Sequence, residues 1–192
     1  MVRGLVRHET LQIALCKAIR RVGDLKDGIQ RGSNKVCEAL REITAGCDPS
    51  TPVFVFKEVA VNRLKAQSRR ADLVFYIPKV RLVTVEYKTV EDSRITGEST
   101  DLHERQLRET HQNLITNLTY KTSLPPFGTC EGKLLKVTTL LLTRRFWSGK
   151  KCDDVVVQYT SPTNTGIKER TDHTFLVNVL GRLGRCARYG GR

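Results

Sequence analysis

Two charged side chains, Glu86 and Lys88, stand two residues apart in the otherwise mostly apolar segment VTVEYKTV. In a β-strand, residues with this spacing point to the same face of the sheet. A second apolar segment, ADLVFYI, precedes it, and the short piece 78–80 lies between them, so the pattern predicts a β-hairpin. With that loop, the numbers of paired residues sum to 158, and Asp72 is predicted to lie directly opposite Glu86.

Two carboxylates in this arrangement favour a bound cation. Residues opposite each other on antiparallel strands lie roughly 4.5–5.5 Å apart, and two carboxylates at 5 Å repel by about 3 kcal/mol at an effective dielectric near 20. Mg²⁺ or Mn²⁺ held by Asp72 and Glu86 would turn this repulsion into coordination and leave positions for water and phosphate oxygens. Lys88 beside them could position a water, help to deprotonate it, or stabilise charge on phosphate. The alternative is an ordinary amphipathic hairpin whose Glu86–Lys88 pair is a solvated surface ion pair.

The elements that must position these residues follow from the periodicity of the sequence. Helical spacing alternates with segments rich in β-branched and aromatic residues, and this predicts an α/β domain with a mixed central sheet. Gly46 suits the left-handed position after the second helix, and Gly23 is predicted to end the first. The predicted helices are 9–22, 33–46, 102–118 and 174–183, with a polar loop at 91–101, and the predicted strands are 53–64, 71–77, 81–90, 134–145 and 153–160. We expect one domain over residues 1–180 and a flexible basic tail over 181–192.

Charge and composition limit the partners. Among 192 residues, 33 Lys and Arg stand against 20 Asp and Glu, a net charge of +13. Such a surplus favours a polyanion, most often nucleic acid and less often an anionic membrane surface, although a solvated surface without a partner is the alternative. No segment reaches the roughly 18–20 apolar residues of a membrane span, and His8 and Glu9 interrupt any secretory signal. We therefore expect a soluble intracellular chain, whose six scattered cysteines are free thiols.

The sequence also resembles a known superfamily. An Asp, thirteen residues, then Glu-x-Lys across a hairpin, between one helix and a second helix that bears Gln, is similar to the PD-(D/E)XK nucleases. More closely, the chain resembles the herpesvirus core family of small basic nuclear proteins (the UL-twenty-four family). Ala71 stands at the position for which the superfamily motif names a proline. The similar stretches, within residues 30–145, are NKVCEAL, FKEVAV, RRADLVFYI, VTVEYKTV, RQLRETHQNL and TTLLLTRR.

The resemblance implies a restriction-endonuclease-like core, in which helices flank the mixed sheet. It makes Asp72 and Glu86 the metal ligands and Lys88 the catalytic lysine. On the third helix, Gln112, or with less support Gln106, would reach back toward the phosphate. The activity implied is hydrolysis of phosphodiester bonds in DNA with Mg²⁺ or Mn²⁺.

The resemblance extends to a further acid and to the cellular role. An acidic residue on the preceding helix often completes such sites, which makes Glu38 the candidate and Glu42 the second choice; the alternative is a surface glutamate. The family is associated with the host nucleus and nucleolus, with virions, and with nucleolar reorganisation and cell-cycle arrest. Host nuclear or nucleolar proteins are therefore further partner candidates.

Basic clusters near the predicted site are candidates for nucleic-acid contacts, because guanidinium and ammonium groups bind phosphates. Phe146 or Trp147 could stack on an unpaired base. His103, His111 and His173 are expected to be structural or exposed. The basic candidates are Arg69, Arg70, Arg105, Arg108, Arg144, Arg145, Lys150 and Lys151.

Three functions are consistent with these patterns. The first is a metal-dependent endonuclease, and the second is a nuclear effector that keeps the nuclease fold without cleaving nucleic acid. The third is a basic RNA- or ribosome-binding module in which Glu-x-Lys occurs by chance. The paired acids Asp72 and Glu86 count against the third, because a disused site loses its costly carboxylates first. They do not separate the first two.

Overall fold

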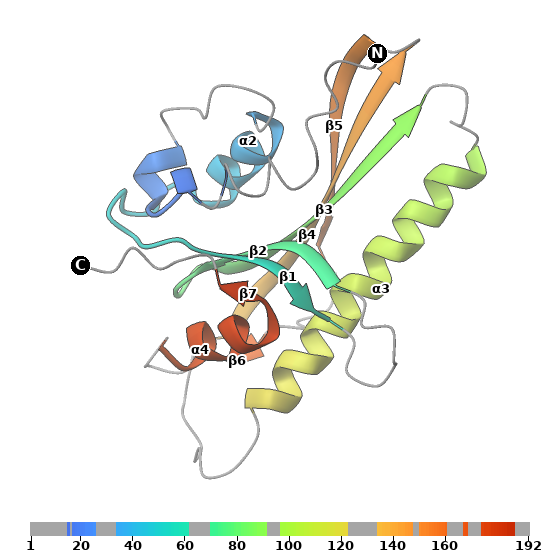
Figure 1. The fold of residues 1–192 in the computed structure, drawn as a ribbon. Helices are drawn as coiled ribbons and strands as arrows, with labels where there is room; N and C mark the ends of the chain where they lie inside the picture. Colours follow the sequence, from blue (N-terminus) through green and yellow to red (C-terminus); the bar gives the residue numbers. More distant parts are fainter. Residues whose placement is uncertain are drawn as a thin grey trace.

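The computed structural model describes residues 15, 17–25, 34–61, 70–91, 97–122, 134–147, 150–160, 167–168 and 174–186. Within these ranges the chain forms a mixed β-sheet with helices on both faces (Figure 1). This confirms the predicted α/β class. The elements, in chain order, are η1 (Val22–Leu25), α2 (Asn34–Ile43), β1 (Phe54–Ala60), β2 (Arg70–Ile77), β3 (Arg81–Glu91), α3 (Gly97–Thr122), β4 (Leu134–Trp147), β5 (Lys150–Thr160), β6 (Ile167–Lys168), α4 (Thr174–Leu183) and β7 (Arg185–Cys186).

The sheet follows the order β5-β4-β3-β2-β1-β7, and β6 pairs with β4 beside this path. β1, β2 and β3 are consecutive antiparallel neighbours, as short connections allow. β3 and β4 are parallel, because the long helix α3 between them returns the chain to the end of the sheet at which β3 began. β5 then pairs antiparallel with β4. Both strands of the parallel β3–β4 pair have a neighbour on each side in this order.

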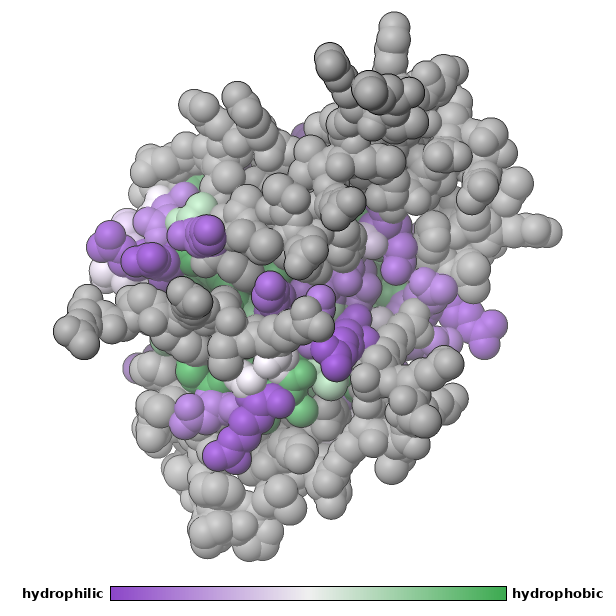
Figure 2. Space-filling model, viewed as in Figure 1, coloured by the Kyte–Doolittle hydropathy of each residue, from purple (hydrophilic) through white to green (hydrophobic). Residues whose placement is uncertain are grey.

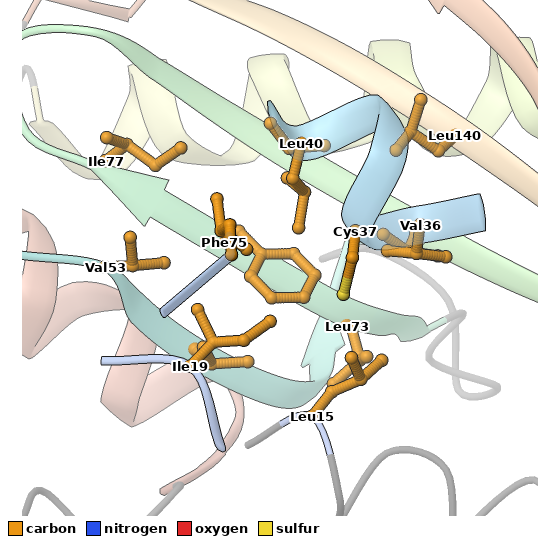
Figure 3. Packing of buried hydrophobic residues seen from close by; sticks show 14 of the residues in the cluster. Leu15, Ile19, Val36, Cys37, Leu40, Val53, Leu73, Phe75, Ile77 and Leu140 are labelled. Atoms are coloured by element: carbon orange, nitrogen blue, oxygen red, sulfur yellow. The ribbon is translucent and has the colours of Figure 1, made fainter. Parts of the chain in front are cut away.

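One face of the sheet is covered by η1 and α2. Val36, Cys37 and Leu40 are fully or almost fully buried there, four residues or fewer apart on one side of α2. They surround the ring of Phe75 from β2, together with Ile19 (Figure 3). Burial of each side chain of this size contributes roughly 1.5–3 kcal/mol to the free energy of unfolding. This cluster therefore holds α2 on its face of the sheet.

The opposite face is covered by α3 and α4. Leu114 and Ile115 of α3 and Leu176 and Leu180 of α4 form a second buried cluster with alternate residues of the strands, such as Tyr76. Along β3 and β4 the two clusters therefore take opposite sides of the strand, as the two-residue repeat of a strand requires. Seen from the side of Figure 1, hydrophilic described residues spread over the surface, and hydrophobic ones show only in small areas between them (Figure 2).

Several element boundaries differ from those predicted. Gly46 has the predicted left-handed conformation, with a φ of 82°, but α2 already ends at Ile43, before the predicted end of this helix. Gly23, however, does not end a helix but lies inside η1, where its N–H donates to the carbonyl of Pro49 at 2.9 Å. α3 begins at Gly97, inside the predicted 91–101 loop, and acidic residues such as Glu98 in its first turn favour the positive end of the helix dipole.

The first part of the predicted tail is folded. α4 continues to Leu183, and β7 then pairs with β1 through Phe56–Cys186 and Lys57–Arg185. Gly184 makes this possible: a Cβ there would lie 2.9 Å from the carbonyl oxygen of Lys57. Flexibility therefore does not begin at residue 181, and residues 187–192 lie outside the described part.

Candidate functional site

The predicted register of the hairpin is confirmed. β2 and β3 pair from Ile77–Arg81 to Leu73–Val85, and each pair of residue numbers sums to 158. Beyond Leu73–Val85 the ladder of paired residues stops, one step before Asp72 and Glu86. There the Asp72 side chain, instead of a backbone carbonyl, accepts a strand hydrogen bond: Asp72 Oδ2 accepts from the Tyr87 N–H at 2.7 Å.

Pairing is interrupted on the other side of Asp72 as well. The register of β1 and β2 runs through Lys57–Leu73 and Val59–Ala71, and Glu58 stands at the position opposite Asp72, between these two pairs. Glu58 has a φ of 51°, a left-handed conformation that costs a side-chain-bearing residue roughly 1–2 kcal/mol. By register, three acidic residues on three neighbouring strands therefore stand opposite one another: Glu58 on β1, Asp72 on β2 and Glu86 on β3. The sequence offered no signal for Glu58, because a single Glu in an apolar strand predicts neither strain nor a break in pairing.

Glu86 and Lys88 point toward α3. Thr84, two residues earlier, contacts Thr139, which in turn contacts His111 of α3, and residues two apart share a face. Glu86 is buried, with 8% of its surface exposed. Its Oε2 lies 4.0 Å from Lys88 Nζ, and the Lys88 side chain is 31% exposed. Glu86 and Lys88 therefore do not form the solvated surface ion pair that was the alternative prediction, because Glu86 is buried and only Lys88 is partly exposed.

A buried polar network lies next to this pair. The Thr84 hydroxyl donates to Thr139 Oγ1 at 2.7 Å, and Thr139 Oγ1 lies 2.8 Å from His111 Nδ1. All three residues are at most 2% exposed. Burial disfavours the charged imidazolium and lowers the pKa of His111. His111 is therefore structural, as expected; the sequence signal for the network was a His on the apolar face of a helix and two Thr in an apolar strand.

Glu38 is not brought to these residues. It lies on α2, which packs over the face of Phe75 and Leu140, whereas Glu86 faces α3. Its carboxylate forms an ion pair with Lys35 at 2.9 Å. The role of Glu38 as a further acid stays a prediction; the structure places it on the helix that covers the face of the sheet opposite to Glu86, which the sequence could not tell. Glu42, the second choice, is exposed on the same helix.

Gln112 lies on an exposed side of α3. The buried side of α3 is formed by Leu107, His111 and Leu114, and Gln112 is exposed on another side of the helix. A residue next to His111 in sequence is rotated by about 100° around a helix, so it does not share that residue's direction. Gln106 is half-buried.

The basic candidates differ in their surroundings. Arg70 Nη1 lies 3.5 Å from Glu58 Oε2, and Arg105, with its side chain 80% exposed, lies 3.4 Å from Glu109. Arg108 is exposed on α3, and Arg69 lies outside the described residues. Each described pair is exposed enough to open at little cost when a phosphate competes.

The remaining four basic candidates belong to β4 and β5. By register, Lys88 pairs with Thr143, so Arg144 and Arg145 follow along β4 beyond the Glu86–Lys88 pair. Across the other edge of β4, they stand opposite Asp154 and Asp153 of β5. Lys150 and Lys151 stand opposite Trp147 and Phe146. The backbone thus places these four basic residues at the same end of the sheet as Lys88.

Within the described ranges, no group of three or more His, Cys, Asp or Glu residues is arranged to hold a metal ion. Carboxylate oxygens are nonetheless the ligands that Mg²⁺ and Mn²⁺ prefer, and Asp72 and Glu86 supply two of them. No family model, curated protein or solved structure matches this chain. No helix in the described ranges is long and apolar enough to cross a membrane, in agreement with the sequence prediction.

Proposed function

We propose that this protein is a herpesviral nuclear protein with a PD-(D/E)XK endonuclease-like site that hydrolyses phosphodiester bonds in DNA. The observation that supports it best is the buried Glu86 carboxylate 4.0 Å from Lys88, at the point where pairing between β2 and β3 stops beside Asp72. Removing a carboxylate and its ammonium neighbour from water costs folding free energy. A role of this pair in function would explain why the protein carries that cost. The mixed sheet flanked by helices is compatible with this superfamily.

In the proposed site, Asp72 and Glu86 would hold Mg²⁺ or Mn²⁺. When bound, such an ion polarises the phosphate and acidifies a water molecule. The interruption of the sheet at Asp72 keeps its carboxylate beside the backbone of residues 86 and 87, with Oδ2 anchored by the Tyr87 N–H. Lys88, partly exposed, can orient a water or stabilise negative charge on the phosphate while its neighbour Glu86 keeps its ammonium group in place.

Nucleic-acid binding would use the basic residues at this end of the sheet. Arg144, Arg145, Lys150 and Lys151 follow the Glu86–Lys88 pair in register, and the net charge of +13 favours a polyanion. In register, Arg144 and Arg145 stand opposite Asp154 and Asp153, whereas Lys150 and Lys151 stand opposite Trp147 and Phe146.

A cleavage assay tests the proposal. Supercoiled plasmid and branched DNA are incubated with the protein and Mg²⁺ or Mn²⁺, and Glu86→Gln and Lys88→Ala are compared with Glu42→Gln and Lys35→Ala, which remove the same charges from exposed positions on α2. We expect both site variants to lose cleavage while the controls keep it. Cleavage by Glu86→Gln or Lys88→Ala at the rate of the wild type would show that the pair has no part in the activity.

A second candidate function is a nuclear or nucleolar effector that keeps this fold, binds nucleic acid or host proteins and does not cleave. Two observations favour it: no cluster of three potential ligands occurs in the described ranges, and one Asp72 oxygen is already engaged by a backbone N–H. Calorimetric titration of Mn²⁺ into the wild type and Asp72→Asn separates the two functions. Heat of binding that Asp72→Asn abolishes supports the nuclease, and no heat in either protein supports the effector.

A further inference from the structure

A pair of basic residues stands at the other end of the sheet. Arg81 and Lys136 are Cα partners on the parallel strands β3 and β4, which run about 4.8 Å apart. Arg81 precedes Glu86 by five residues, which is about 16 Å along a strand. Arg81 has the same parity as Val83 and Val85, which belong to the cluster under α2, whereas Glu86 faces α3. This pair is therefore separate from the proposed nuclease site in both position and face.

Their side chains share one face. An Arg81 Nη1 hydrogen bond to Thr138 Oγ1 at 2.5 Å places the guanidinium group over β4. Thr138 follows Lys136 by two residues on the same strand, so both point to the side on which Arg81 lies. Thr138 is fully buried, Arg81 is half-buried and Lys136 is exposed. The Thr138 hydroxyl thus fixes the orientation of the guanidinium group beside a solvent-accessible ammonium group.

No described carboxylate balances these two charges. Four of the other described basic residues, Lys35, Arg70, Lys88 and Arg105, form ion pairs with Glu. Arg81 and Lys136 form none with any Asp or Glu of the described ranges, and Arg81 Nε is buried there without a hydrogen-bond partner. Like charges on paired strand positions repel, so an anion that contacts both would remove a cost that this part of the fold carries.

We propose that Arg81 and Lys136 form a binding site for a phosphate group, distinct from the nuclease-like site. The guanidinium fork can donate two parallel hydrogen bonds to phosphate oxygens, and Lys136 adds a flexible point charge. The phosphate is that of a nucleic-acid strand or free phosphate, and the chain's charge of +13 favours a polyanionic source. The site does not depend on cleavage at Glu86.

Two titrations test this site in the full chain. In the first, inorganic phosphate is added and the melting temperature is followed for the wild type, Arg81→Gln and Lys136→Gln. Lys17→Gln, which removes one exposed charge elsewhere, serves as the matched control. Lys136 is exposed, so its variant is expected to fold even if Arg81→Gln does not. We expect phosphate to raise the melting temperature of the wild type and of the control but not that of Lys136→Gln.

In the second titration, a single-stranded oligonucleotide is bound at several salt concentrations. Loss of one phosphate contact should weaken binding about three- to tenfold at low salt and reduce the slope of log K against log salt by about 0.7. If Lys136→Gln lowers both responses, the phosphate belongs to nucleic acid; if only the inorganic phosphate response is lost, the ligand is free phosphate. If Lys136→Gln matches Lys17→Gln in both titrations, the proposal is wrong.

Discussion

Replacing Asp72 with Asn and with Ala separates its structural role from its proposed role as a metal ligand. In the structure, Asp72 Oδ2 accepts the Tyr87 N–H at 2.7 Å. A hydrogen bond to a charged group contributes about 1.5–3 kcal/mol and a neutral one about 0.5–1.5 kcal/mol. Asn keeps a neutral acceptor, so Asp72→Asn should lower the free energy of unfolding by about 1 kcal/mol. Ala leaves the N–H without this acceptor, and we expect a loss of about 2–3 kcal/mol.

Thermal and urea unfolding measure this difference. For a chain of this length, 1 kcal/mol corresponds to about 2–4 °C in melting temperature, so Asp72→Asn should melt about 2–4 °C lower and Asp72→Ala about 4–12 °C lower. Glu42→Ala, which removes an exposed charge from α2, is the control and should stay within about 0.5 kcal/mol of the wild type. Hydrogen exchange at the Tyr87 amide should accelerate most in Asp72→Ala. Equal stability of the two Asp72 variants would refute the argument that this hydrogen bond holds the end of the hairpin.

Two further predictions concern the core and the sheet edge. Burial lowers the pKa of His111 in the folded state, so the unfolded chain takes up the proton first as the pH falls. The free energy of unfolding should therefore decrease below about pH 6.5. The decrease is at most ~1.4 kcal/mol per pH unit, until the folded-state pKa is reached. Urea midpoints between pH 5 and 8 should show this fall, and His111→Gln should flatten it; an unchanged slope would contradict the assignment. Gly184→Ala should cost about 1–3 kcal/mol, because the new Cβ would lie 2.9 Å from the Lys57 carbonyl oxygen and 3.0 Å from Val59 Cγ2. The measurement is the urea midpoint of Gly184→Ala, compared with that of Gly181→Ala, an exchange inside α4. Equal midpoints would contradict the argument that the close approach at Gly184 requires glycine.

The hairpin could be predicted from local pattern alone. The loop length and the alternation of apolar residues determine which residues of β2 and β3 pair, and the pairs Ile77–Arg81 to Leu73–Val85 confirm that register. The pattern could not show that the pairing stops at Asp72. That interruption depends on Glu58, from a third strand with its own positive φ, and on a side-chain hydrogen bond to the Tyr87 backbone.

The positions of the helix candidates could not be predicted, for a different reason. The period of a helix shows which residues share a side, as with Leu107, His111 and Leu114 on α3. It does not show which face of the sheet that side covers. The pattern therefore could not show that Glu38 lies on a helix over the face opposite to Glu86. Gln112 is a candidate through its place in a similar motif, and on α3 it lies away from the buried side of the helix.

By itself, the sequence determined the α/β class, the hairpin and its register, and the strongly basic charge of the chain, because these depend on local spacing, turn length and composition. Only the tertiary structure decided that β3 and β4 run parallel, that α2 and α3 cover opposite faces, and that β7 closes against β1. Those features join segments far apart in the chain. Their geometry is set by which apolar surfaces can be buried together, and no local pattern encodes that choice.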